Sequence, residues 1–229
     1  MSNLIKLLFI SLSMLAGSAQ ATVVTQLGTT VSFSYDDSLL GLFGTPTVVG
    51  DQLSFSPNTW VAKATGSQSF DLKNYTANIT ITALNSGDSI NTIALAEKGD
   101  YISKGSTSYV EVGGQIRVTD ANAPLNEVKD SITPSAAFTQ TASYFPTQNW
   151  AATADANVSA FATSSVNVTI ENILIALSDK FGDLGFIEKK GVVLNATVAA
   201  VPLPQAVWLF GAGLFGLLSV SKRKKWSIG

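Results

Sequence analysis

Residues 165–170 read Ser-Val-Asn-Val-Thr-Ile, a strict alternation of polar and apolar side chains. Successive side chains of a β-strand point to opposite faces, so Val166, Val168 and Ile170 share one face. One apolar face and one polar face are typical of an antiparallel sheet that covers a core on one side only. The stretch therefore predicts a half-buried antiparallel strand.

The alternation changes phase immediately after this stretch. Beyond Glu171 and Asn172, the apolar side chains occupy odd-numbered positions, at Ile173, Ile175 and Leu177. A shift of one residue moves side chains to the opposite face of a sheet, and an extra residue in one strand produces such a shift. We therefore expect a β-bulge or a corner at Glu171-Asn172.

Four further stretches alternate in a similar way, at 31–35, 78–84, 110–118 and 192–198. Turn-forming residues stand between the stretches, at 36–38, 85–88, 98–100 and 182–183;. Many short alternating strands joined by turns favour a sandwich or a jelly roll, and we find no sustained helical period. The sequence predicts an all-β fold for residues 22–200, a single antiparallel β-sandwich or jelly-roll-like domain.

Two adjacent lysines, Lys189 and Lys190, lie in the stretch 186–191. Charged side chains, lysine above all, are common on the edge strands of sheets, where they discourage pairing with other chains. We expect this lysine pair to lie at a solvated strand edge.

The first 21 residues have the pattern of a signal peptide. Lys6 precedes a short apolar run at 7–15, and Ala19 and Ala21 place small residues at the two positions that signal peptidase requires;. The run is too short for a helix that crosses a bilayer of roughly 30 Å. The sequence predicts export through the Sec translocon and cleavage by signal peptidase, with Thr22 as the new N-terminus.

The last 29 residues combine three unlike segments. Prolines keep the first segment extended, the second is an uncharged apolar run at 206–220, and the third is a basic cluster;. With its flanks the apolar run approaches the roughly 20 residues that span a membrane, which predicts a transmembrane helix. Clustered cations stop transfer, and tryptophan is favoured at the interface. The residues concerned are Val201, Pro202, Leu203 and Pro204, then Trp208, then Lys222, Arg223, Lys224 and Lys225.

On these residues, segment 201–225 resembles the PEP-CTERM sorting signal of Gram-negative bacteria, followed by a short stub at 226–229. Leu203 stands where the proline motif of that family has a glutamate. The resemblance implies recognition by an exosortase, and association with exopolysaccharide or biofilm material. It also implies an exported protein that is first tethered to the inner membrane and then lies at the cell surface or in the extracellular matrix. An ordinary single-pass C-terminal anchor is the alternative interpretation.

The charge distribution argues against a nucleic-acid partner. Five of the 14 Lys and Arg residues lie in the two end segments, whereas all 16 Asp and Glu residues lie between them, which leaves that middle part a net charge of −7. Nucleic acids require clustered cations. The chain also has no cysteine and no histidine. Disulfides, zinc sites of the usual Cys and His kinds, and Ser-His-Asp triads are therefore excluded.

Carboxylates remain as the only candidates for catalysis or metal binding. Asp36-Asp37 could bind calcium or act in a glycosidase, and Asp179 and Asp183 lie in a loop that could surround Ca²⁺, but capped turns explain both better;. Six aromatic residues could form a sugar-stacking surface, although burial is the usual fate of such side chains. They are Trp60, Tyr75, Tyr101, Tyr109, Tyr144 and Trp150.

We expect no cofactor, no metal and no enzymatic activity, and we expect a structural surface protein. Two alternatives stay open: a carbohydrate- or calcium-binding module, and a hydrolase that uses a pair of carboxylates about 5–10 Å apart.

Overall fold

The computed structural model describes residues 22–200, together with Phe210 and Ala212. The predicted signal peptide with Ala19 and Ala21, the proline motif, Trp208, the predicted transmembrane helix apart from Phe210 and Ala212, and the basic cluster lie outside these residues. Among the residues described, no helix is long and apolar enough to cross a membrane.

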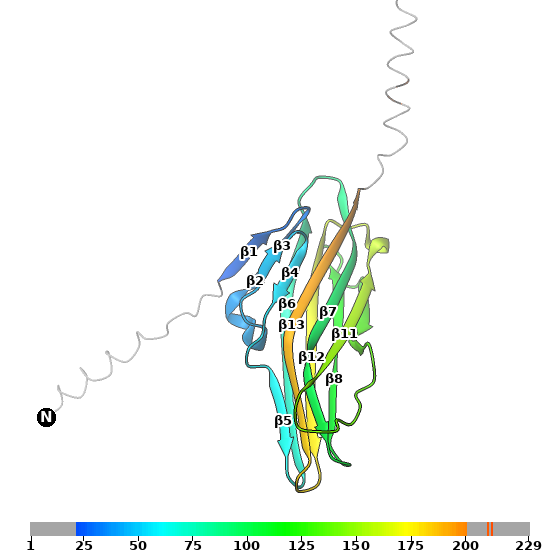
Figure 1. Ribbon diagram of the computed structural model, residues 1–229. Coiled ribbons are helices and arrows are strands. Elements are labelled where there is room, and N and C mark those ends of the chain that lie inside the picture. The colour runs from blue at the N-terminus through cyan, green and yellow to red at the C-terminus, as the bar shows by residue number, and fades with distance from the viewer. Residues whose placement is uncertain (1–21, 201–209, 211, 213–229) are drawn as a thin grey trace, which may run out of the picture.

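Thirteen strands form two antiparallel sheets, which lie face to face along the long axis of the molecule (Figure 1). In order across the first sheet lie β1 (Val23–Leu27), β2 (Val31–Asp36), β6 (Ser69–Ala83), β12 (Ser165–Ser178), β8 (Tyr109–Asp120) and β9 (Glu127–Ser131). In order across the second lie β10 (Thr133–Pro134), β11 (Gln148–Asn157), β7 (Asp88–Lys104), β13 (Leu184–Ala200), β4 (Gln52–Phe55) and β3 (Thr47–Val49). β5 (Val61–Thr65) also pairs with β13.

Residues 22–200 contain no α-helix, only three short 3₁₀ turns, η1 (Asp37–Leu39), η2 (Gly41–Phe43) and η3 (Ser159–Phe161). The prediction of an all-β fold with antiparallel sheets packed as a sandwich is therefore confirmed. The inward faces of both sheets bury one continuous hydrophobic core. Its aromatic centre is Phe43, whose ring lies 4.8 Å from Trp60 and 5.2 Å from Phe55.

The predicted bulge at Glu171-Asn172 is wrong. β12 keeps one register along its whole length, both with β6 and with β8. Even-numbered residues point into the core throughout, so Asn172 is buried between Ile170 and Leu174. The odd-numbered Ile173, Ile175 and Leu177 lie on the outer face of the sheet.

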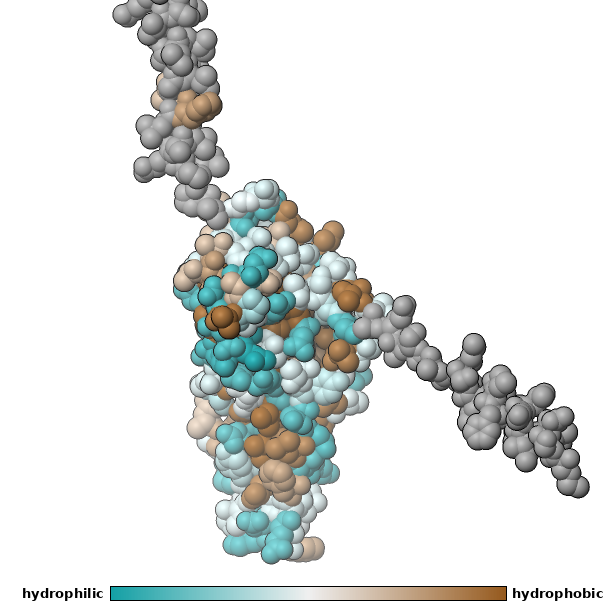
Figure 2. All heavy atoms as spheres, turned by 180° about the vertical axis from the view of Figure 1, so that it is seen from behind, coloured by the Kyte–Doolittle hydropathy of each residue, from teal (hydrophilic) through white to brown (hydrophobic). Residues whose placement is uncertain are grey.

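These outer apolar residues misled the prediction because the lower half of β12 is apolar on both faces. Leu177 pairs with Phe70 and with Tyr109, and Ile175 pairs with Leu72. Phe70, Leu72 and Tyr109 are themselves exposed. A cluster of hydrophobic side chains is visible in the lower half of the face that Figure 2 shows.

A bulge does occur in β13, at Lys190. Lys189 pairs with Gly99 of β7, and Gly191 pairs with the adjacent Lys98, so Lys190 is the extra residue. The inward positions consequently change from odd numbers (Ile187, Lys189) to even numbers (Val192, Leu194, Ala196).

The expectation of a solvated edge for the lysine pair is therefore wrong. β13 is a central strand, which pairs with β7 on one side and with β4 and β5 on the other, and Lys189 is 0% exposed. The turn expected at 98–100 is wrong too, because these residues lie inside β7. Gly99 serves close packing there, since a Cβ atom would collide with the carbonyl oxygen of Glu188.

Candidate functional site: a buried lysine, glutamate and asparagine

Three polar side chains meet in the core between the two sheets. Lys189 of β13 is 0% exposed, Asn172 of β12 is 1% exposed and Glu97 of β7 is 3% exposed. Lysine and glutamate are almost never fully buried without a partner, because each charge loses its hydration. The core of this sandwich therefore contains a polar centre that requires an explanation.

The three side chains form a closed ring of hydrogen bonds. The Nζ atom of Lys189 donates to Oε2 of Glu97 and to Oδ1 of Asn172. The Nδ2 atom of Asn172 donates to Oε1 of Glu97. Each side chain thus contacts both others, and the ring joins one sheet, through β12, to the other, through β7 and β13.

Backbone geometry explains why the three side chains converge. Glu97 and Gly99 both point inward from β7, and Gly99 pairs directly with Lys189. Glu97 is therefore a diagonal neighbour of Lys189, within reach of a long side chain. Because the bulge inserts Lys190 as an extra residue, Lys189 points inward from an odd-numbered position, and Val192 and Leu194 point inward from even-numbered positions;. Asn172 faces both from the opposite sheet.

Two tryptophans enclose the amine. The Nζ atom of Lys189 lies 4.8 Å from the ring centre of Trp60 and 5.7 Å from that of Trp150. Both rings are within the distance at which a cation is attracted to an aromatic face. Trp150 is fixed by a hydrogen bond of 3.1 Å from its Nε1 to the carbonyl oxygen of Glu188.

Burial changes the acid–base behaviour of the lysine. Desolvation lowers the pKa of Lys189 to about 8, although the charge of Glu97 and its hydrogen bond to the lysine act in the opposite direction;. A much larger fraction of this amine is therefore neutral near pH 7–8 than of an exposed lysine. A neutral amine is a nucleophile, and here it lies against a carboxamide and a carboxylate.

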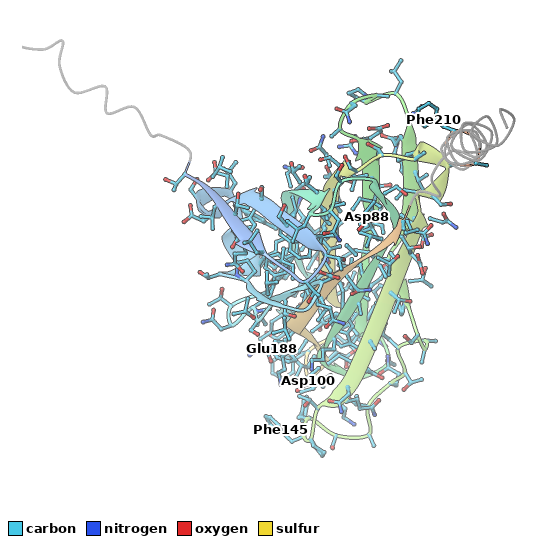
Figure 3. All side chains as sticks on the ribbon, turned by 90° about the horizontal axis from the view of Figure 1, so that it is seen from above. Asp88, Asp100, Phe145, Glu188 and Phe210 are labelled. Carbon is cyan, nitrogen blue, oxygen red and sulfur yellow. The ribbon has the colours of Figure 1, made fainter. Side chains whose placement is uncertain are left out.

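The neighbouring Lys190 has different surroundings, and its pKa is shifted in the opposite direction. Lys190 points to the outer face, where it pairs with Asp100 and lies 3.7 Å from Glu188. Asp100 and Glu188 lie close together on β7 and β13 (Figure 3). The hydrogen bond to Asp100 raises the pKa of Lys190, so this exposed amine stays protonated.

Two of the carboxylates proposed from the sequence, Asp36 and Asp183, accept hydrogen bonds in turns. Asp36 caps η1, since its Oδ1 accepts hydrogen bonds of 3.0 Å and 2.6 Å from the backbone N–H and hydroxyl of Ser38. Asp183 accepts hydrogen bonds of 2.9 Å and 2.6 Å from the backbone N–H and hydroxyl of Thr107, and these hold its pKa below the usual value. Asp179 is exposed. No group of three acidic residues that could hold a metal occurs among the residues described.

The six aromatic residues do not form one platform. Trp60, Tyr101 and Trp150 are buried in the core, Tyr75 packs against it, and Tyr109 and Tyr144 are exposed on different strands and loops. A smaller group of exposed aromatic side chains lies at the lower end of the sandwich in Figure 1, beside the β5–β6 and β12–β13 turns. Tyr144 and Phe181 line one shallow pocket there with Thr65 and Gly66. Phe145, labelled in Figure 3, follows Tyr144, whose hydroxyl donates to the carbonyl oxygen of Gly182 in the β12–β13 turn, and Phe145 is 79% exposed.

Sequence analysis missed that Glu97, Asn172 and Lys189 meet. The signal that could have found them is a polar residue at a core position of an alternating strand. Glu97 follows Ile93 and Leu95 at the same spacing, and Asn172 lies between Ile170 and Leu174.

Comparisons with known proteins leave the family open. No family model matches the chain, and no curated protein matches it. Among solved structures, a chain of the infectious bursal disease virus Gt strain is 11% identical, with a TM-score of 0.18, over 75% of this chain and 49% of that one. This chain thus spans about half the length of the viral chain. A score this low carries no argument about fold or function.

Proposed function

We propose that the chain is an exported, non-enzymatic structural protein of the cell surface or extracellular matrix, sorted by an exosortase-type system and associated with exopolysaccharide. The two end segments of the sequence support export and sorting. Residues 22–200 would be the displayed domain, a sandwich of jelly-roll-like kind.

The observation that carries the proposal is the position of β13 in the fold. This strand is 17 residues long, lies in the middle of its sheet and ends at Ala200, directly before the proline motif in the sequence. A tether that follows β13 would act on a strand that β7 pairs along nearly its whole length. Such a strand resists extraction because many backbone hydrogen bonds must break together.

The direction in which β13 leaves the sandwich also suits display at a surface. β13 ends at the upper end of the molecule in Figure 1, whereas the turns between β5 and β6, β7 and β8, and β12 and β13 lie at the lower end. A tether at the upper end would hold those turns away from the membrane.

The mass of the mature protein tests the proposal. The full chain is expressed in a host that encodes an exosortase and in the same host without it, and both termini are sequenced by mass spectrometry. We expect Thr22 as the N-terminus in both strains, and a C-terminus near Pro202–Gln205 only where the exosortase is present. A protein that keeps residues 208–229 in both strains would reduce the tail to an ordinary anchor.

A carbohydrate-binding module is a second candidate, favoured by the exposed aromatic group of Tyr144, Phe145 and Phe181 at the lower end. Exposed aromatic faces pack against sugar rings and lose little conformational entropy. Affinity electrophoresis in gels that contain exopolysaccharide from the producing strain measures the binding. We expect Phe145→Ala with Phe181→Ala to abolish retardation, and Tyr109→Ala, an exposed aromatic of the outer sheet face, to leave it unchanged. Equal retardation of all variants would eliminate this site.

A further inference from the structure

We propose that Lys189 and Asn172 become joined by an intramolecular isopeptide bond, formed by the protein itself with Glu97 as the catalytic acid–base. The bond would connect β13 of one sheet to β12 of the other through the core. The inference rests on residues 22–200 alone and is independent of where the protein is located.

Burial limits which groups can react at this site. All three side chains are at most 3% exposed, so no dissolved substrate reaches them. The reacting groups must therefore be those already present, namely one amine, one carboxylate and one carboxamide. An amine and a carboxamide held in contact by a folded core have a very high effective concentration, on the order of 10⁵ M or more for well-oriented groups.

The carboxylate of Glu97 lies between the attacking and the leaving nitrogen. Oε2 of Glu97 accepts a hydrogen bond from the attacking nitrogen, Nζ of Lys189, and Oε1 accepts one from the leaving nitrogen, Nδ2 of Asn172. A single carboxyl group thus bridges the two atoms between which a proton must move. This is the geometry that general acid–base catalysis of amide exchange requires.

The apolar surroundings of the hydrogen-bonded ring favour the neutral, reactive form of the amine. The rings of Trp60 and Trp150 exclude water around Nζ. Although each ring attracts a cation, the loss of hydration is the larger effect and disfavours the ammonium relative to the neutral amine;. In an apolar site, transfer of a proton from an ammonium to a carboxylate replaces two costly buried charges by two neutral groups. Water exclusion also protects the product from hydrolysis.

The reaction is balanced without a co-reactant. The ammonium of Lys189 gives a proton to Glu97, and the freed lone pair of Nζ forms a bond to Cγ of Asn172 while the carbonyl π pair moves onto Oδ1. Glu97 donates its proton to Nδ2 and accepts one from Nζ. The electron pair on Oδ1 re-forms the carbonyl, the Cγ–Nδ2 bond breaks, and ammonia leaves. The products are a secondary amide, free ammonia and a protonated Glu97.

Asn172 is the electrophile in preference to Glu97 because a carboxylate anion resists attack by an amine. The two possible bonds differ in mass, since coupling to Asn172 releases ammonia and coupling to Glu97 releases water. They also differ in the peptides that become joined.

Peptide mapping decides between them. The protein is purified from cells that express the full chain, denatured, and digested with trypsin together with an endoproteinase that cleaves before aspartate. The bond predicts that peptide 155–178 is joined to peptide 183–190, at the summed mass less one ammonia, with no cleavage after Lys189. Free peptides 155–178 and 183–189 would overturn the proposal. So would a product of 183–190 with peptide 88–98, which contains Glu97, at the summed mass less one water.

Variants test the role of Glu97. We expect Glu97→Gln to give only the free peptides in its soluble, folded fraction, because the amide cannot shuttle the proton. Lys189→Arg is the unlinked reference, and Lys190→Arg, which changes the exposed neighbour, should retain full linkage. A fully linked Glu97→Gln protein would show that the carboxyl group is not the catalyst. The wild-type digest decides the bond itself, whatever the variants do.

Discussion

Lys189 and Lys190 are consecutive residues, yet Lys189 is fully buried between Trp60 and Trp150 whereas Lys190 is on the outer face beside Asp100. The bulge at Lys190 determines the positions that follow, where Val192 and Leu194 return to the core. The same pair of residues thus contains one amine enclosed in the core and one that is solvated.

Asn172→Ala should lower the melting temperature, because the variant loses the isopeptide bond in addition to the two polar contacts of Asn172 within the ring. An isopeptide bond between residues 172 and 189 closes a loop of about 18 residues, which by analogy with disulfides stabilises the fold by roughly 3 kcal/mol. For a domain of this size that corresponds to about 6–12 °C. Calorimetry of the purified variant measures the change. Asn167→Ala, an exposed position on the same strand, should shift the midpoint by no more than about 2 °C;.

A protein that cannot form the bond should become more stable as the pH rises above 8. The pKa of Lys189 is about 8 in the folded protein, compared with 10.5 for an ordinary lysine. The unfolded state therefore binds more protons between these values, and the free energy of unfolding increases with pH there. Glu97 of β7 is the charged group that faces the amine; Trp60 and Trp150 surround it, and the Asn172 position contributes no charge.

Urea titrations of Asn172→Ala at pH 8 and pH 9.5 should therefore differ by roughly 1–2 kcal/mol, since each pH unit contributes at most about 1.4 kcal/mol. Asn172→Ala combined with Lys189→Met removes the titrating group and should lose the rise. The linked wild-type protein should lack it too, because an amide nitrogen does not titrate. A rise of equal size in the wild-type protein would contradict the isopeptide bond.

Much of the fold could be predicted from the sequence. The surroundings of Lys189 and Asn172 were predicted wrongly, the first as a solvated strand edge and the second as a bulge. Period-2 alternation identified β2, the upper half of β12 and the end of β13, because each has one polar face. It misplaced the bulge, since Ile173 and Ile175 are apolar on an outer face and imitate a change of parity. It could not bring Glu97, Asn172 and Lys189 together, because their meeting depends on strand register across two sheets.

Residues 182–185 should not bind calcium. The carboxylate of Asp183 is engaged by the fold, because it holds the β7–β8 turn through Thr107, which leaves the exposed Asp179 as the second acidic side chain of the loop. Calcium sites need six to eight oxygen ligands. We therefore expect the melting temperature to be the same in millimolar Ca²⁺ and in a chelator. A rise of several degrees that Asp179→Asn abolishes would count against this interpretation.

The exported protein should begin at Thr22. Signal peptidase accepts small neutral side chains at the positions of Ala19 and Ala21;. Ala19→Asp with Ala21→Asp should therefore leave the precursor unprocessed, which N-terminal sequencing detects. Thr22→Ser, a change just after the expected cleavage site, is the matched control and should mature normally. Normal maturation of the double variant would disprove the site.

The last prediction concerns the proline motif, which follows Ala200 at the end of β13. Proline cannot donate a backbone hydrogen bond, so we expect Pro202 and Pro204 to keep this segment out of both the strand and the predicted helix. The backbone between them would then be open to a membrane peptidase, and Lys222, Arg223, Lys224 and Lys225 would hold the tail at a fixed depth. Pro202→Ala with Pro204→Ala should leave export intact and trap an unprocessed, membrane-bound form in a host that has the exosortase. Replacement of the four cations by serine should instead weaken stop-transfer and release the uncut chain. Fractionation of membranes with mass measurement of the C-terminus separates the two results. If the proline variant is cut as efficiently as the wild type, the motif is not what the enzyme recognises.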